Sequence, residues 1–262
     1  MNLVKKKYQH VLEFAMDLGK TCSILNPQDN ALTFARNDKY LENLLEEKDK
    51  AIWVLVPFKI SRGLLNKLPK NIYPYVLDEE DSIEYVWTYI HNTVNKDVEP
   101  EIIIGKDCYI HPRAIIGVHG NTYAKAPDGT RLHLKEIGGV QIGDRVDIEA
   151  NSIVHRSCFG NTIIEDDVKV CVMCNIGHNT KIGKRTYIAP GVLLGGGTQI
   201  GEDCFIWQGV ITHSQTKICD RVMVGNGSYV HRDITESGIY AGSPAKFIKP
   251  FDERVLKGEV QW

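Results

Sequence analysis

Aliphatic residues spaced six apart over more than a hundred positions predict that most of this chain is a parallel β-helix. Ile164, Val170 and Ile176 begin a run of such steps that continues to Val230, with Thr212 in one of the places. An α-helix repeats about every 3.6 residues and a simple strand about every 2, so neither explains a period of six. Short strands joined by turns do explain it, and three of them make one triangular coil of 18 residues.

A second column of side chains supports the same fold. A small residue stands two places before each aliphatic at fourteen successive positions, from Val146 to Ser228. Glycine follows many of the aliphatics, as at Gly177 and Gly183, where we expect tight turns. We therefore expect about six coils between residues 104 and 230, stacked about 4.8 Å apart with the aliphatic column inside.

The period breaks twice and does not extend to either end of the chain. The breaks are a four-residue insertion at 158–161 and a longer excursion at 118–136. We assign residues 101–234 to the prism and residues 235–262 to a loop with a short C-terminal helix.

Residues 1–100 alternate strand-like and helix-like segments, which predicts a small α/β domain. Ser82 is the expected N-cap of its last helix. The expected helices cover 5–19, 37–50 and 82–96, the expected strands cover 31–35, 51–58 and 71–78, and 97–101 is the link to the prism.

Composition excludes several classes of function. A formal net charge of −2 without a long basic run argues against nucleic acid as a partner. No apolar run is long enough to span a membrane, and the N-terminus lacks a signal-peptide core. The seven cysteines contain no zinc-type pair and suggest a reducing, cytoplasmic setting. Cys108, Cys174 and Cys204 occupy the small-residue column, which favours a role as compact core residues.

Several motifs resemble a known enzyme family. The stretches "GGVQIGDRVDIEANSIVHR", "NTIIEDDVKV", "NIGHNTKIG" and "ITESGIY" resemble the UDP-3-O-acylglucosamine N-acyltransferases, as does "LTFARNDKY" near the N-terminus. This resemblance covers residues from about 25 to 240 and implies a left-handed β-helix. The tail is shorter than in that family. Its "AGSPAKFIK" resembles the closing motif of CoA-dependent sugar acetyltransferases.

We therefore expect an N-acyltransferase that moves a short acyl group, acetyl or hydroxyacyl, from acyl-CoA to a UDP- or dTDP-linked amino (dideoxy)sugar. Related enzymes serve surface-polysaccharide pathways and are homotrimers with sites between adjacent prisms, which the resemblance implies here too. No tightly bound cofactor is expected. A lipid A type enzyme that uses acyl carrier protein is the alternative.

The candidate catalytic centre is His178 with Gly196. An amine that attacks a thioester must lose a proton, which suits a histidine base. Gly196 lies 18 residues after His178, so it should stack beside it and offer its N–H to an oxyanion. The resemblance implies that Asn179 helps to order the site. A surface histidine and a simple turn glycine are the plainer interpretations.

The resemblance assigns uridine binding to the stretch that contains Phe34, Asn37 and Tyr40. Aromatic rings around a pyrimidine with an amide at its edge are chemically sensible, although uracil and thymine look alike to such a site. Phe34 as a core residue and Tyr40 as helix packing are the alternatives.

The last coils and the tail supply candidates for binding CoA. Gly209 and Gly227 would let a pantetheine arm pass close to the backbone, Trp207 would line the acyl pocket, and Lys246 and Lys249 would meet the phosphates. We also expect the 118–136 excursion, with its "PDGT" turn, to reach over a neighbouring subunit and shape the site.

No metal site is expected. The other prism histidines, His111, His155, His213 and His231, follow inward residues at coil corners, and we expect them to be exposed or at subunit contacts, as we do for His133 in the excursion. A three-histidine zinc site of the hexapeptide-repeat carbonic anhydrase type is the competing idea, although that family's histidine spacing is absent. A non-catalytic scaffold would leave the His178–Gly196 pair without a purpose.

Overall fold

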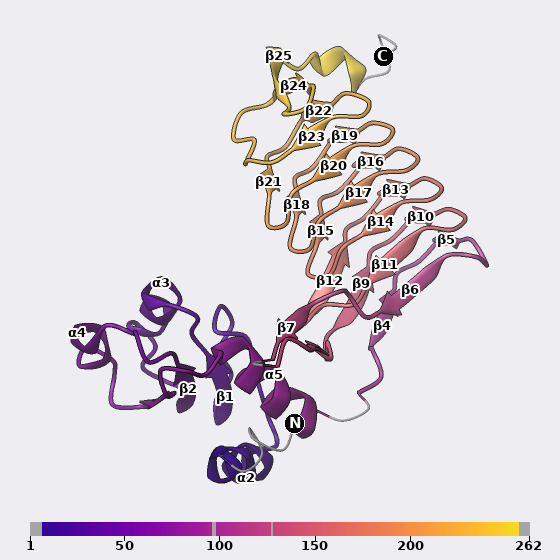
Figure 1. Ribbon diagram of the computed structural model, residues 1–262. Coiled ribbons are helices and arrows are strands. Elements are labelled where there is room, and N and C mark those ends of the chain that lie inside the picture. Colours follow the sequence, from indigo (N-terminus) through magenta and orange to yellow (C-terminus); the bar gives the residue numbers. More distant parts are fainter. Residues whose placement is uncertain (1–6, 96–97, 127, 257–262) are drawn as a thin grey trace. The chain divides into compact units, whose positions relative to one another are not determined.

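The structure is a computed structural model that describes residues 7–95, 98–126 and 128–256. The chain divides into two compact units. One is Met1–Val98 with Asn121–Lys135, and the other is Glu99–Gly120 with Glu136–Trp262. Figure 1 shows the second unit as a stack of coils, coloured from magenta to yellow. No helix among the described residues combines the length and apolar character needed to cross a membrane.

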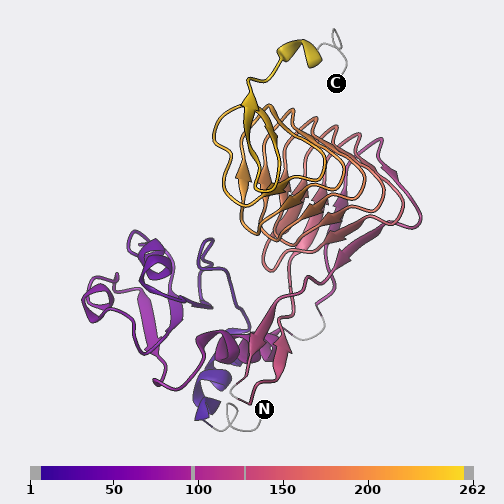
Figure 2. The same cartoon turned by 45° about the horizontal axis from the view of Figure 1, so that its top comes forward.

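The coils of the second unit form three sheets, one for each wall of a prism, and their strands are parallel except for β25 at one end (Figures 1 and 2). The first wall contains β5 (Tyr109–Ile110), β10 (Asp147–Ile148), β13 (Lys169–Val170), β16 (Tyr187–Ile188), β19 (Phe205–Ile206), β22 (Val222–Val224), β24 (Gly238–Ala241) and β25 (Lys246–Lys249). The second contains β6 (Ile115–Val118), β11 (Ile153–His155), β14 (Asn175–Ile176), β17 (Leu193–Leu194), β20 (Ile211–Thr212) and β23 (Tyr229–Val230). The third contains β4 (Ile102–Ile104), β9 (Gly139–Ile142), β12 (Asn161–Ile164), β15 (Lys181–Ile182), β18 (Gln199–Ile200) and β21 (Lys217–Ile218).

The strand register confirms the 18-residue coil. Ile164 pairs with Ile182, and Ile182 pairs with Ile200. The aliphatic and the small-residue columns both face the interior. Ile176 and Ile188 are fully buried, as are Val192 and Thr198 from the second column. The six-residue pattern therefore folds as predicted because each strand can bury two side chains and must then turn.

The glycines after the aliphatics serve a different purpose from the one expected. Left-handed backbone occurs three places after the aliphatic, as at Asn179, Arg185 and Gly191. The glycine directly after the aliphatic is needed because the next coil lies too close for a side chain. A Cβ at Gly183 would lie 2.6 Å from the carbonyl carbon of Gly201.

The C-terminal segment contains more regular structure than the expected loop and helix. Strand β24 continues the first wall in parallel with β22, and β25 returns antiparallel to it. A short 3₁₀-helix, η2 (Glu253–Val255), follows. The expected C-terminal helix otherwise falls on residues 257–262, outside the described ones. The first residues of the expected 5–19 helix, the last residue of the expected 82–96 helix, residue 97 of the link and residue 127 of the "PDGT" turn are also outside them.

The first unit is built on a parallel sheet of order β1–β2–β3, as its alternating pattern predicts. Gly19 ends the first helix in the left-handed conformation, and the Ser82 side chain accepts a hydrogen bond from the Tyr85 N–H at the start of the last. Its elements are α2 (Gln9–Leu18), β1 (Ala31–Phe34), α3 (Asp38–Leu41), η1 (Glu42–Leu44), β2 (Ile52–Val56), α4 (Arg62–Leu65), β3 (Ile72–Val76) and α5 (Ile83–Val94).

The helix expected over 37–50 is much shorter in the structure. It ends with η1 at Leu44. The Asn71 side chain donates hydrogen bonds to the carbonyl oxygens of Glu47 and Lys50, 3.1 and 2.7 Å away. These carbonyls are thus satisfied by a loop contact instead of a further helical turn.

The excursion folds as a hairpin of the first unit, which corrects the expectation that it belongs to the prism. Its strands are β7 (Tyr123–Lys125) and β8 (Arg131–His133). The Asn92 side chain on α5 donates to His133 O at 2.7 Å and accepts from Lys135 N at 2.9 Å. Residues 118–120 and 136, at the two ends of the excursion, stay in the prism unit.

Candidate active site

The candidate site lies on one edge of the prism, where the chain turns from the second wall to the third. We call the turns that follow β6, β11, β14 and β17 the corner stack. His178 is in the turn after β14, and Gly196 is in the turn after β17. The Gly197 N–H donates to His178 O at 2.7 Å, so these turns lie directly beside each other. The structure therefore brings together the two residues that the spacing predicts to be neighbours.

Gly196 leaves room that the imidazole occupies. A Cβ at Gly196 would come 2.7 Å from Cε1 and 2.8 Å from Cδ2 of His178, and it would come nearest to Nε2. In the part of the chain that the structure describes, the Gly196 N–H has no hydrogen-bond partner, whereas its carbonyl accepts from the Gln215 N–H. A substrate oxygen beside the imidazole is thus offered an unused backbone donor.

Asn179 fixes which imidazole nitrogen carries the proton. Its Oδ1 accepts from the Cys158 N–H at 3.1 Å, and its Nδ2 donates to Ser157 Oγ at 2.7 Å. Ser157 Oγ in turn donates to Phe159 O, which sets the orientation of the whole chain of bonds. Asn179 Oδ1 lies 2.8 Å from His178 Nδ1. Nδ1 therefore carries the hydrogen, and Nε2, which faces Gly196, keeps the lone pair of a base.

The backbone of Asn179 explains why this residue type stands here. Its φ is 61°, in the left-handed region that asparagine tolerates better than most side chains. Its N–H is also bonded, to Thr162 Oγ1 at 3.0 Å in the coil before it. One residue thus serves both the turn and the imidazole.

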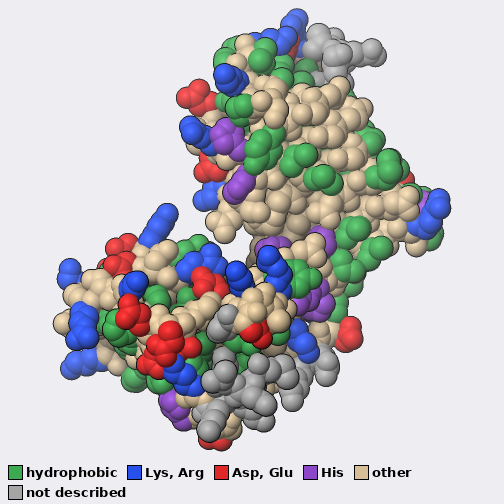
Figure 3. Space-filling view, viewed as in Figure 1, with side chains coloured by type: hydrophobic (Ala, Val, Ile, Leu, Met, Phe, Trp, Pro, Cys, Tyr) green, Lys and Arg blue, Asp and Glu red, His purple; other side chains and the backbone are tan. Residues whose placement is uncertain are grey.

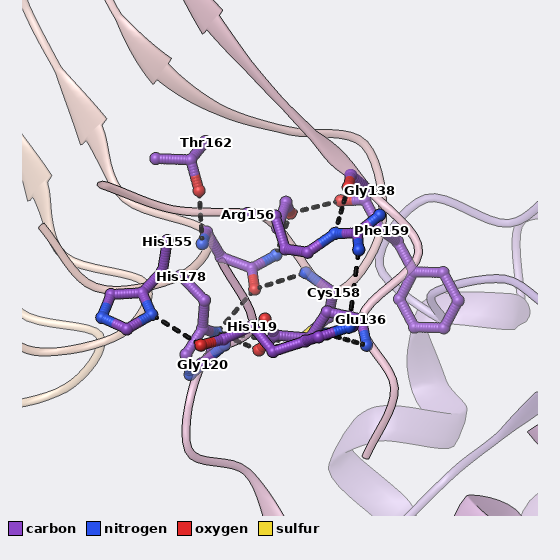
Figure 4. Close-up of polar contacts among 12 residues, drawn as sticks. His119, Gly120, Glu136, Gly138, His155, Arg156, Cys158, Phe159, Thr162 and His178 are labelled. Carbon is purple, nitrogen blue, oxygen red and sulfur yellow. Dashed lines mark hydrogen bonds and ion pairs between the residues drawn. The ribbon is translucent and has the colours of Figure 1, made fainter. Parts of the chain in front are cut away.

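A buried carboxylate and a thiol lie behind the imidazole (Figure 4). The Glu136 side chain is fully buried, and its Oε1 is 3.9 Å from His178 Nδ1. The Cys158 thiol lies 3.5 Å from the same Oε1 and 3.6 Å from Nδ1. Burial, with the negative charge of Glu136, raises the pKa of Cys158 well above its usual value, so the thiol keeps its proton at neutral pH.

A second layer of polar groups supports the corner stack. The Arg156 side chain is buried, its Nε donates to Gly138 O at 3.1 Å and its Nη1 lies 3.5 Å from His119 Nε2. Burial lowers the pKa of Arg156, while the charge of Glu136 opposes that shift. The Glu136 N–H donates to His119 Nδ1 at 3.2 Å.

His155 is buried, which corrects the expectation of an exposed corner. Its Nδ1 donates to His119 O, and its Nε2 is 2.9 Å from Asn175 Oδ1. Of the other histidines, His213 and His231 are exposed, while His111 and His133 are half-buried.

The sequence contained a signal for Glu136 and Cys158 that the six-residue pattern alone does not reveal. Both breaks in the period fall in the corner stack, one after β6 and one after β11. The break at 158–161 makes Val154 pair with Ile176, 22 residues later instead of 18. Two successive coils therefore carry extra chain directly below His178, and this extra chain supplies both side chains.

The residues expected to bind the nucleotide have structural roles in the first unit. Phe34 stacks on Trp87, with ring centroids 5.1 Å apart. Asn37 is the N-cap of α3 and accepts from the Tyr40 N–H at 3.3 Å. Tyr40 packs, half-buried, against the apolar core of this unit. A role in binding a base stays a prediction.

The residues expected to bind CoA lie along the last coils and the tail. Trp207 is half-buried, 6.0 Å from the Tyr187 ring. Gly209 and Gly227 have φ of 66° and 63° with open space around them, so turn geometry already accounts for their identity. Lys246 and Lys249 are exposed at the two ends of β25.

A cavity of about 420 Å³ lies at the C-terminal end of the prism. His231, Arg232, Lys246 and Phe247 are among its lining residues. Of the expected CoA residues, only Lys246 is in this lining.

Two groups of metal-type donors occur among the described residues, and neither consists of three imidazoles. One is Glu136 with Cys158 and His178, and the other is Asp78 with Glu80 and Asp81, of which Asp78 and Glu80 are exposed. The first group offers carboxylate, thiol and imidazole donors. Nδ1 of His178, however, carries a hydrogen and has no lone pair to offer a metal ion. The arrangement therefore fits a hydrogen-bonded cluster better than a metal centre.

Two protein-family models match the prism. The model described as bacterial transferase hexapeptide (six repeats) matches residues 161–196 and 197–232. The model described as hexapeptide repeat of succinyl-transferase matches residues 136–156. Residues 136–156 and 161–232 of the prism thus match models of hexapeptide repeats, in agreement with the six-residue period. A solved structure, the UDP-N-acetylglucosamine acyltransferase of Francisella novicida, matches with a TM-score of 0.53 and 21% identity over 60% of this chain and 56% of that one. This likeness shows the fold, a left-handed β-helix.

Curated relatives share higher identity with this chain over part of their length. The UDP-3-O-acylglucosamine N-acyltransferase of Shewanella denitrificans is 44% identical over 143 residues, which cover 55% of this chain and 42% of the relative. A probable mitochondrial enzyme of the same description from Arabidopsis thaliana is 31% identical over 157 residues, covering 60% and 52%. The chain thus spans about half the length of the curated relatives it matches.

Proposed function

We propose that this protein is an N-acyltransferase that moves a short acyl group from acyl-CoA to the amino group of a UDP- or dTDP-linked amino sugar. The observation that carries the proposal is the pairing of His178 Nε2, which keeps a lone pair, with the unused N–H of Gly196. The names of the curated relatives support the substrate class, a nucleotide-linked amino sugar.

In this proposal the chain's own groups carry out the transfer. The acceptor amine attacks the thioester carbonyl carbon, a C–N bond forms, and the amine proton goes to Nε2 of His178. The oxygen of the tetrahedral intermediate carries the negative charge and accepts a hydrogen bond from the Gly196 N–H, a contact worth about 3 kcal/mol in such sites. When the C–S bond breaks, the imidazolium returns its proton to the leaving thiolate.

Assembly as a homotrimer belongs to the same proposal. The second wall carries apolar side chains on its outer surface, next to the corner stack. Ile115, Leu193 and Ile211 are 48%, 44% and 44% exposed, and Leu193 pairs with Ile211 in adjacent strands. Figure 3 shows apolar side chains spread over the visible face of the prism. A second prism against this wall would cover them and would close the site around His178.

The proposal is tested by following free thiol release with a matrix of donors and acceptors. The acceptors are UDP- and dTDP-linked amino sugars, and the donors are acetyl-CoA, a hydroxyacyl-CoA and the same acyl group on acyl carrier protein. We expect thiol release only with an amino sugar present and with a CoA donor. If thiol is released only when acyl carrier protein is the donor, the protein is instead an enzyme of the lipid A type. Absence of transfer with every pair would contradict the proposed function.

A further inference from the structure

The buried carboxylate of Glu136 is held in a fixed orientation behind the imidazole of His178. Its Oε2 accepts the Gly120 N–H at 2.5 Å, from the other end of the excursion. Its Oε1 accepts the Cys158 thiol at 3.5 Å and lies 3.9 Å from His178 Nδ1. The side chain has no exposed surface. A carboxylate buried this completely is expected to serve either the fold or a reaction.

We infer that Glu136 is the positioning residue that stabilises the imidazolium of His178 during transfer, an inference that rests on the proposed function. Nε2 is the nitrogen that takes the proton, because Asn179 Oδ1 already accepts the hydrogen on Nδ1. The positive charge then spreads over both nitrogens, and the Nδ1 side faces Glu136. The carboxylate therefore stabilises the ring as positive charge develops on it, which accelerates the reaction rather than tightening substrate binding.

The other groups around the imidazole leave Glu136 as the source of this negative charge. Cys158 is a protonated thiol and carries no charge at neutral pH. Arg156 is cationic and would disfavour an imidazolium. Its Nη1 lies 3.5 Å from Nε2 of His119, whose Nδ1 accepts the Glu136 N–H. Asn179 is neutral and fixes only the tautomer. Among these described neighbours, only Glu136 favours the charged ring.

The same atoms argue against a metal ion in this place. A metal would need the lone pair of Nδ1, but the fixed orientation of Asn179 places a hydrogen there. The cluster therefore acts as a proton-holding network.

Glu136→Gln is the test variant, because the amide oxygen can still accept the Gly120 N–H while the charge is lost. We expect kcat to fall roughly 10- to 100-fold, less than the full effect of a general base, with KM nearly unchanged. Glu165→Gln is the matched control. Glu165 is a prism carboxylate that pairs with Lys181 at 3.0 Å, and its loss should leave kcat unchanged.

A second measurement does not need the substrate. Carbethoxylation of His178 by diethyl pyrocarbonate, mapped by mass spectrometry above about pH 8, reports the nucleophilicity of Nε2. We expect it to be several-fold slower in Glu136→Gln than in the wild type and in Glu165→Gln. If no nucleotide sugar is acylated, the proposed function fails while this measurement still decides the role of Glu136.

Three results would overturn the inference. The first is a folded Glu136→Gln variant with wild-type kcat and carbethoxylation rate. The second is a rise in KM at unchanged kcat, which would show a binding role. The third comes from the wild-type protein and holds even if Glu136→Gln does not fold: a ¹⁵N spectrum with the His178 proton on Nε2.

Discussion

Substituting Gly196 by alanine tests whether the imidazole of His178 occupies the space beside this turn. The three atoms nearest to the added Cβ would all belong to His178, with Cε1 at 2.7 Å and Cδ2 at 2.8 Å. Carbon atoms pack at about 3.5–4.0 Å, so the methyl group and the ring cannot both keep their places. The backbone conformation at this position is compatible with alanine, since Gly196 is not among the residues with positive φ.

The structure gives the size of the effect and the way to isolate it. The ring is 29% exposed and can move aside, but doing so breaks its hydrogen bond to Asn179, so we expect a cost of about 1–2 kcal/mol of unfolding free energy. In a His178→Ala background the clashing atoms are gone, so Gly196→Ala should cost little there. The double-mutant cycle should therefore show a coupling on the order of 1–2 kcal/mol. Urea unfolding of the four proteins, followed by circular dichroism, measures it.

Gly225→Ala is the control for this cycle. Gly225 is also a prism glycine without positive φ, but its Cβ would first meet the Cβ of Ala241, at 3.1 Å. Its cost should be the same whether or not His178 is present. If Gly196→Ala also costs the same in both backgrounds, the ring does not lie against this glycine, and the proposed pairing of base and oxyanion donor is wrong.

Other predictions concern the hydrogen-bond network and the first unit. Asn179→Gly keeps a residue that tolerates left-handed φ but removes the side-chain amide. We expect kcat to fall by about tenfold or more while the melting temperature changes little. An unchanged kcat would show that the His178 tautomer does not depend on Asn179. Cys158 should react slowly with iodoacetamide near neutral pH and faster in Glu136→Gln, because the charge of Glu136 helps to raise the pKa of the Cys158 thiol. Equal rates would show that the Glu136 carboxylate is too far from the Cys158 thiol to affect its pKa. Burial lowers the pKa of His91 from its ordinary 6.5 to about 4. Between these pH values the unfolded chain binds a proton that the folded chain does not. The free energy of unfolding should therefore decrease by about 3 kcal/mol as the pH falls from 6.5 to 4. Urea unfolding at several pH values checks this, and a His91→Gln variant that keeps the same pH dependence would contradict it.

The prism could be predicted from the sequence because its repeat is set locally. Each coil must bury one aliphatic and one small residue per wall, and the 18-residue period then fixes which residues become neighbours. The pairing of Ile176 with Leu194 follows from this, and so does the stacking of His178 on Gly196. Within the prism, contacts between residues one coil apart can therefore be predicted from the period alone.

The parts of the site that interrupt the period could not be placed in this way. Glu136 reaches His178 because the intervening hairpin leaves the prism and returns, and Cys158 reaches it because four extra residues widen one corner. Neither path follows from a six-residue count. The burial of His155 was missed for the same reason, since its partner His119 is at the start of the excursion.

The first unit shows a different limit. Its sheet and its longer helices follow the hydrophobic pattern, but the length of the 37–50 segment does not, because the distant Asn71 side chain bonds its last carbonyls. The tail after residue 235 likewise becomes strand because β22 leaves an open edge for β24. In both cases a contact distant in sequence decides the local structure.

A crystal structure with a non-hydrolysable acyl-CoA analogue would test the proposed centre most directly. We expect the oxygen that stands for the thioester carbonyl to lie within about 3.2 Å of the Gly196 nitrogen, with His178 Nε2 facing the side from which an amine would arrive. An analogue bound with that oxygen on another wall of the prism, away from Gly196, would contradict the proposed reaction at this corner.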